Sequence, residues 1–126
     1  MNVAYPDKFG FLNEQHEEVR RMMTELDTVL NGQMTGNFKM ALTSVLRALM
    51  NHHEKEEQVM RDQNYPERDI HTSYHRHAVG VINSIIQLYD IESTEELRQR
   101  IAAHVANTVS EEVFFDRQLM DFLQDK

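Results

Sequence analysis

Apolar side chains recur along most of this 126-residue chain at alternating steps of four and three positions, the spacing that keeps residues on one face of an α-helix. No segment sustains the apolar–polar alternation that is typical of a β-strand. The clearest stretch runs through Phe38, Leu42, Val45, Leu49, His52, Glu56 and Val59. Two further stretches run through Leu12, His16, Val19, Met23, Leu26 and Leu30, and through His71, His75, Ala78, Ile82, Ile85 and Tyr89. The chain is therefore predicted to be all-α.

Breaks in this pattern predict four helices, over residues 12–30, 38–63, 67–89 and 94–123. Pro66 ends the second helix because proline disfavours a helical conformation of the residue before it. Ser93 and Glu96 have the spacing of a capping box at the start of the fourth helix. Short connections favour antiparallel neighbours. The sequence thus predicts an antiparallel up-down four-helix bundle, in one domain over residues 1–126, on which residues 1–10 pack as an extended arm.

Composition argues against several classes of protein. The chain has no cysteine, which rules out disulfides, zinc–thiolate sites and iron–sulfur clusters. Its net charge is −8 without a basic patch, so nucleic acid and anionic membranes are poor partners. No apolar run reaches the roughly 18–20 residues that span a bilayer, and residues 1–10 lack the blocks of a signal peptide. We therefore expect a cytoplasmic protein that binds neither nucleic acid nor membrane.

Histidine and glutamate occupy positions on the predicted inner faces that are otherwise apolar. Burying an imidazole or a carboxylate is costly unless a partner compensates it, and one metal ion can compensate several such groups. The second helix has two His/Glu pairs with a spacing of four residues. His52 and Glu56 continue the apolar face, whereas His53 and Glu57 are rotated by about 100° and are predicted to face solvent. His52 and Glu56 are therefore predicted metal ligands.

The first and third helices add three inward histidines. His71 and His75 lie one turn apart, so both side chains can point at one ion. His77 lies two residues beyond His75, off that face, and is predicted to be exposed. His16 is the inward histidine of the first helix.

The fourth helix is harder to orient because its apolar face is broad. Its candidate ligands are His104, Glu111, Glu112 and Asp116. Glu111 and Asp116 can flank the inward direction from two sides. His104 lies about 10.5 Å before Glu111 along the helix, too far to bind the same ion, and is predicted to line the core or a pocket.

These ligands suit a pair of metal ions. Imidazole and carboxylate groups without thiolate favour iron, manganese or zinc. Seven ligands are too many for one first-row ion that keeps an open position, but they suit two ions bridged by carboxylates. Glu56 and Asp116 are the natural bridges, because each carboxylate oxygen can bind one metal. The predicted set is His16, His52, Glu56, His71, His75, Glu111 and Asp116.

Four motifs resemble those of the hemerythrins, in particular the short bacterial branch called bacteriohemerythrins. Residues 13–16 (Asn-Glu-Gln-His) resemble the D-x-Q-H opening of that family, and residues 52–60 resemble H-F-x-x-E-E-x-x-M. Residues 65–66 and 71–75 resemble Y-P followed by H-x-x-x-H, and residues 116–123 resemble the closing D-x-x-L-x-x-F-L. Together they span nearly the whole chain in the family's order.

The resemblance implies an antiparallel four-helix bundle around two non-haem irons joined by an oxo or hydroxo bridge. The ligands carried over are His16 and His52 for one iron, His71 and His75 for the other, and Glu56 and Asp116 as bridges. The family has a fifth histidine five residues before the last aspartate, where this chain has Glu111. In an alternative register His104 is that histidine, but the bridging aspartate then falls on Val109, which cannot bind a metal. The match therefore favours Glu111, whose charge favours ferric iron.

The resemblance also implies a protein that binds dioxygen or another small diatomic ligand for storage, delivery or sensing, with no catalytic residue beyond the ligands. The alternative is a di-iron redox enzyme (an oxidase, peroxidase or nitric-oxide-handling protein), because Glu111 brings the ligands closer to those of oxygen-activating di-iron bundles. A further alternative is the sensor input domain of a longer signalling protein, acting on a partner domain.

Overall fold

The computed structural model describes residues 4–31, 37–88 and 95–125. Within these ranges the chain is helical and contains no strand, which confirms the predicted all-α class. The elements in order are η1 (Asp7–Phe9), α1 (Gly10–Leu30), α2 (Phe38–Asp62), α3 (Arg68–Leu88) and α4 (Glu95–Leu123).

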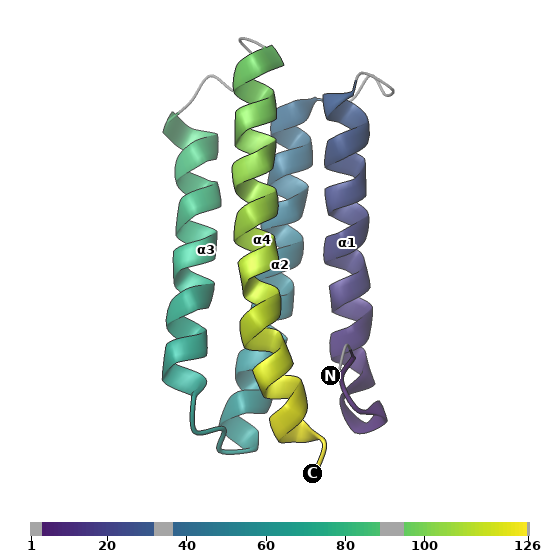
Figure 1. Cartoon of the computed structure of the whole chain (residues 1–126), viewed down its shortest axis with the longest axis vertical. Helices are drawn as coiled ribbons and strands as arrows, with labels where there is room; N and C mark the ends of the chain where they lie inside the picture. Colours follow the sequence, from purple (N-terminus) through teal and green to yellow (C-terminus); the bar gives the residue numbers. More distant parts are fainter. Residues whose placement is uncertain (1–3, 32–36, 89–94, 126) are drawn as a thin grey trace.

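The four long helices lie side by side and alternate in direction (Figure 1). α1 and α3 run one way, and α2 and α4 run the other. Each helix packs on its two neighbours, α1 on α2 and α4, and α3 on α2 and α4. This is the predicted antiparallel up-down bundle. None of the helices in the described ranges is long and apolar enough to cross a membrane.

Local chemistry accounts for the ends of α2. The Asn37 side chain accepts a hydrogen bond of 3.1 Å from the backbone N–H of Met40, which caps the first turn. After Asp62 the backbone reverses at Asn64, whose φ of 53° is in the left-handed region that asparagine tolerates. The predicted stop before Pro66 is thus confirmed. The predicted cap at Ser93 lies outside the described residues.

The segment before α1 packs on the bundle as predicted, although it is not fully extended. Tyr5 and Phe9 are buried, and residues 7–9 form one 3₁₀ turn. Two hydrogen bonds attach Tyr5 to α1. The Tyr5 N–H donates to the Asn13 side-chain oxygen at 2.8 Å, and the Asn13 amide donates to the Tyr5 carbonyl at 3.1 Å.

The interior formed by the described residues contains two apolar clusters. The long apolar cluster consists of Val19, Leu26, Phe38, Leu42, Val45, Ala48, Leu49, Ile82, Ile85, Ile101, Ala102 and Val105. The end apolar cluster consists of Tyr5, Phe9, Leu12, Val59, Met60, Tyr65, Leu119, Met120 and Leu123. Between them along the helices lie the buried polar residues of the bundle, which we call the polar layer. Its members are His52, His53, Glu56, His71, His75, Thr108, Glu112 and Asp116.

Candidate metal centre

Two carboxylates of the polar layer lie between two groups of histidines. Asp116 on α4 directs one oxygen, Oδ2, to His16 Nε2 at 2.9 Å, and this oxygen is also 3.8 Å from His52 Nε2. Its other oxygen, Oδ1, lies 3.1 Å from His71 Nε2. The Asp116 side chain therefore presents one oxygen to histidines of α1 and α2 and the other to a histidine of α3.

Glu56 on α2 divides its oxygens in the same way. Its Oε2 lies 3.2 Å from His52 Nε2, one turn earlier on the same helix. Its Oε1 lies 2.8 Å from His71 Nε2 and 2.9 Å from His75 Nε2. Glu56 is fully buried. These side chains meet because each continues the inward face of α2 or α3, on which residues are spaced by four and three positions.

The result is two groups of donor atoms that share Glu56 and Asp116. One group contains His16 and His52, and the other contains His71 and His75. In each group the donor atoms all lie within 4.8 Å of one another. The structure thus brings together six of the seven predicted ligands.

The donor atoms have the chemistry and spacing that a first-row cation requires. Imidazole nitrogen and carboxylate oxygen bind such ions at about 2.1 Å, which places neighbouring donors about 3 to 4 Å apart. The distances between histidine Nε2 and carboxylate oxygen atoms in both groups are 2.8–3.2 Å, at the short end of this range. Moreover, both ring nitrogens of His52 and the Nδ1 of His71 are buried without a hydrogen-bond partner. An unpaired His52 Nε2 aimed at two carboxylates is suited to bind a metal ion.

Groups behind the donors fix their orientation. The Tyr5 hydroxyl donates a hydrogen bond to Glu56 Oε2. His75 Nδ1 lies 2.8 Å from Glu57 Oε2, so Glu57 can hold a proton on Nδ1 while His75 Nε2 points at the centre. A carboxylate behind the second ring nitrogen is typical of metal-binding histidines. Glu57 was predicted to face solvent, but it is half-buried and supports the ring of His75.

In the metal-free protein, opposite charges strongly shift the pKa values of this layer. Burial alone would lower the pKa of His52, but Glu56 and Asp116 raise it to about 10. The pKa of His71 rises to about 9, again against burial and because of the same two carboxylates. Burial alone would raise the pKa of Glu56, yet its histidine partners hold it well below the usual range. Protons therefore occupy the positions that cations would take.

The pKa values of Glu112 and His53 shift in the opposite directions, so that both groups are favoured in their neutral forms. Burial, together with the charges of Asp116 and Glu56, raises the pKa of Glu112 to about 8. Burial and the nearby His75 lower the pKa of His53 to about 3. His53 is therefore a neutral imidazole at physiological pH.

The structure corrects the predicted orientation of Glu111. This side chain is exposed and accepts a hydrogen bond of 3.1 Å from the Tyr74 hydroxyl, which also donates to the Thr108 carbonyl. The buried residue is its neighbour Glu112. The reason is helix phase, because a residue five positions before Asp116 points about 140° away from it, whereas one four positions before points about 40° away. The sequence itself indicates that Glu112 faces inward, because it continues a face with steps of three and four. That face consists of Val105, Thr108, Glu112, Asp116, Leu119 and Leu123.

The structure also corrects the environments of two histidines. His53, predicted to face solvent, is buried and stacks on His75 with ring centroids 3.8 Å apart, and its Nε2 bonds to Glu112. Its burial follows from the position of α2 between α1 and α3, which covers more than one face of the helix. His104, predicted to line the core or a pocket, is exposed. His77 is exposed, as predicted.

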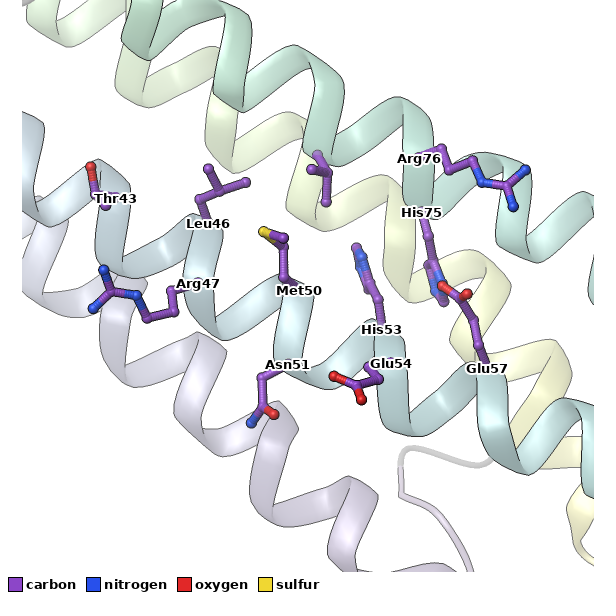
Figure 2. A pocket seen from close by; sticks show the side chains of 11 residues that line it. Thr43, Leu46, Arg47, Met50, Asn51, His53, Glu54, Glu57, His75 and Arg76 are labelled. Carbon is purple, nitrogen blue, oxygen red and sulfur yellow. The ribbon is translucent and has the colours of Figure 1, made fainter.

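Two hollows reach the centre from different sides. A small one of about 70 Å³ lies between α1, α2 and α4, and it is lined by His16, Val19, Arg20, His52, Val109, Glu112, Val113 and Asp116. A larger one of about 750 Å³ lies between α2 and α3, with His53 and His75 side by side in its wall and Glu57 next to His75 (Figure 2). Each group of histidines thus adjoins a separate opening.

Comparison with known proteins assigns this arrangement to a family. The family model of the hemerythrin HHE cation-binding domain matches residues 7–116, which covers all four helices up to Asp116. Comparisons with curated proteins and with solved structures found no match. The motifs, the four-helix bundle and the shared carboxylates agree with that assignment. The chain therefore belongs to the hemerythrin HHE cation-binding family.

Proposed function

We propose that this protein binds dioxygen at a non-haem di-iron centre, for storage, delivery or sensing. The observation that carries the proposal is the division of oxygens in Glu56 and Asp116. Each carboxylate presents one oxygen to the histidine group of α1 and α2, and the other to the histidine group of α3. A carboxylate placed in this way is suited to bridge two cations.

The two groups of donor atoms correspond to two proposed iron positions. His16 and His52 would hold one iron, His71 and His75 would hold the other, and Glu56 and Asp116 would bridge them, beside an oxo or hydroxo bridge. An iron pair bound there would supply the electrons that dioxygen binding requires. The protein's own part is to fix the ligands, through Tyr5 and Glu57, and to exclude bulk water with the two apolar clusters.

The small hollow beside His16 and His52 supports a diatomic ligand. Its volume of about 70 Å³ is several times the roughly 10–15 Å³ that a cavity needs to hold one water molecule. Three valines, Val19, Val109 and Val113, form part of its lining. Such a space admits dioxygen or a molecule of similar size.

A di-iron redox enzyme is the second candidate, and one observation favours it. The larger hollow between α2 and α3 reaches the buried rings of His53 and His75, and it has room for an organic reductant or substrate. A sensor input domain, in a cytoplasmic signalling protein, would use the same centre and would need an output partner.

Oxygen binding under controlled conditions distinguishes the first two candidates. The chain is loaded with iron(II) without oxygen, mixed with oxygen in a stopped-flow spectrometer, and then placed under vacuum. We expect the absorption change to reverse, with recovery of the oxygen taken up. Rapid, irreversible conversion to ferric protein would contradict oxygen carriage and would favour the enzyme.

A further inference from the structure

This inference rests on the proposed di-iron function and concerns the ligand that α4 adds to it. We propose that Glu112 binds the ion held by His71 and His75, and that His53 is a positioning residue that orients Glu112. The exposed Glu111, which occupies the position of the family's fifth histidine, would then have no contact with metal.

The Glu112 carboxylate lies inside the bundle, close to the proposed ligands. It is buried and lies one helical turn before Asp116, so both carboxylates face the interior. Its Oε1 lies 3.6 Å from His75 Nε2, the atom that is also 2.9 Å from Glu56 Oε1. Donors of one first-row ion are about 3 to 4 Å apart. Glu112 therefore lies at the distance of a further ligand to the ion that His75 holds.

A separate third ion is excluded by the number of free nitrogens on His75. His53, His75 and Glu112 form a third group of donor atoms within 4.8 Å of one another. However, His75 Nδ1 bonds to Glu57, so only Nε2 is available to a metal. One lone pair binds one ion, and an ion held between His75 and Glu56 Oε1, 2.9 Å from that nitrogen, would already use it. Glu112 must therefore join the existing pair of ions.

The contact between His53 and Glu112 defines the positioning role. Metal binding requires an ionised Glu112, which can only accept a hydrogen bond, so a neutral His53 with its proton on Nε2 then donates to it. His53 Nε2 bonds to Glu112 Oε1, and the His53 ring is held flat against His75, with an interplanar angle of 6°. Its ring therefore cannot rotate away without losing the stack. Such support behind a ligand commonly changes metal affinity by about 10- to 100-fold.

The proposal changes the chemistry of the centre. With Glu112, two bound ions would have four histidine and three carboxylate ligands, and the third carboxylate would stand in place of the fifth histidine. Carboxylate oxygen is a harder and more anionic donor than imidazole, so it favours ferric over ferrous iron. We therefore expect faster oxidation in air than a five-histidine centre would show.

The test compares Glu112→Gln with Glu111→Gln, two isosteric changes at adjacent positions, in the whole chain. Both variants and the native protein are loaded with iron(II) without oxygen and challenged with a chelator, and iron per chain is measured by elemental analysis. We expect Glu112→Gln to bind one of its two ions at least about tenfold more weakly. Glu111→Gln should match the native protein.

A third variant tests the positioning role. His53→Phe keeps the flat ring against His75 but removes the donor to Glu112, so we expect a smaller loss of affinity for the same ion. Its ⁵⁷Fe Mössbauer spectrum should change at one iron only, which a general loss of packing would not produce. If Glu112→Gln fails to fold by circular dichroism, Glu112→Asp replaces it, since the carboxylate is kept but its reach is shortened.

Failure of the di-iron centre and failure of Glu112 as a ligand give different results. Native protein that binds fewer than two irons overturns the proposed function. Native protein with two irons, together with unchanged binding in the Glu112 variant, overturns the inference alone. A loss in Glu111→Gln instead would make Glu111 the ligand and would also overturn it.

Discussion

The inner face of α2 is apolar along one stretch and polar along the next. Leu42, Val45 and Leu49 fill the long apolar cluster, and His52 and Glu56 continue the same face one turn further along. All five side chains are at least 99% buried. Helical period thus determines which residues are inside, whereas side-chain chemistry determines what the interior can do.

The two regions differ in how burial affects stability. Each buried leucine stabilises the fold through its own apolar area, by about 1.5–3 kcal/mol. A buried histidine or carboxylate lowers stability unless a partner compensates it. In the polar layer the histidines and carboxylates compensate one another, and His52 still has both ring nitrogens without a hydrogen bond. The apolar cluster is complete by itself, whereas the polar layer is not.

The largest expected effect comes from removing a ligand. His71→Ala should lose at least one metal ion per chain, because His71 Nε2 contacts both Glu56 and Asp116. Elemental analysis after anaerobic loading measures the loss. His77→Ala on the same helix is the control, since His77 is exposed. Full occupancy in His71→Ala would mean that α3 supplies no essential ligand.

The next effect tests the independence of the apolar cluster. Leu49→Ala should lower the free energy of unfolding by about 2–5 kcal/mol, because it leaves a cavity in a fully packed region. The loss should be the same with and without metal, as measured by urea unfolding. Met50→Ala, at an exposed neighbour, should change stability by much less. A loss confined to the metal-loaded protein would show that the two regions are coupled.

A pH series sharpens the contrast, since only the polar layer titrates. The pKa values of His52 and His71 are raised to about 10 and about 9, so at neutral pH both rings hold protons that a cation must displace. Zinc affinity should therefore rise by up to about tenfold per pH unit for each proton displaced, and level off above about pH 10. Competition with a chelator at several pH values measures this. A flat profile from pH 6 to pH 8 would contradict it.

The same shifts affect the metal-free fold with the opposite sign. Because the folded pKa values exceed the ordinary value of 6.5, the stability that these two histidines contribute is fully present below pH 6.5. It is lost as pH rises through about 9 to 10. Rising pH therefore strengthens metal binding while it weakens the metal-free protein.

The smallest expected effect is at Glu111. Glu111→His would restore the family's fifth histidine by sequence, yet the side chain is exposed and bonds to Tyr74. We therefore expect an unchanged rate of oxidation in air, followed by absorption spectroscopy. Slower oxidation would show that residue 111 reaches the iron.

Sequence period predicted most of this centre. His16, His52, Glu56, His71, His75 and Asp116 converge because each continues an inward face with steps of four and three. Glu112 is one of the four candidates on α4, but the five-residue spacing of the family motif favours Glu111, against the phase of the helix. His53 was missed because one inward face was assigned to α2, although α2 packs on two neighbours. Whole-chain packing, rather than local spacing, decides such positions.

Iron titration of the native chain tests the central claim most directly. The polar layer should bind two iron ions per chain, and the loaded protein should unfold at a higher temperature than the metal-free protein, because a ligand that binds only the folded state stabilises it. A chain that takes up no iron, with equal unfolding temperatures in both preparations, would contradict the account.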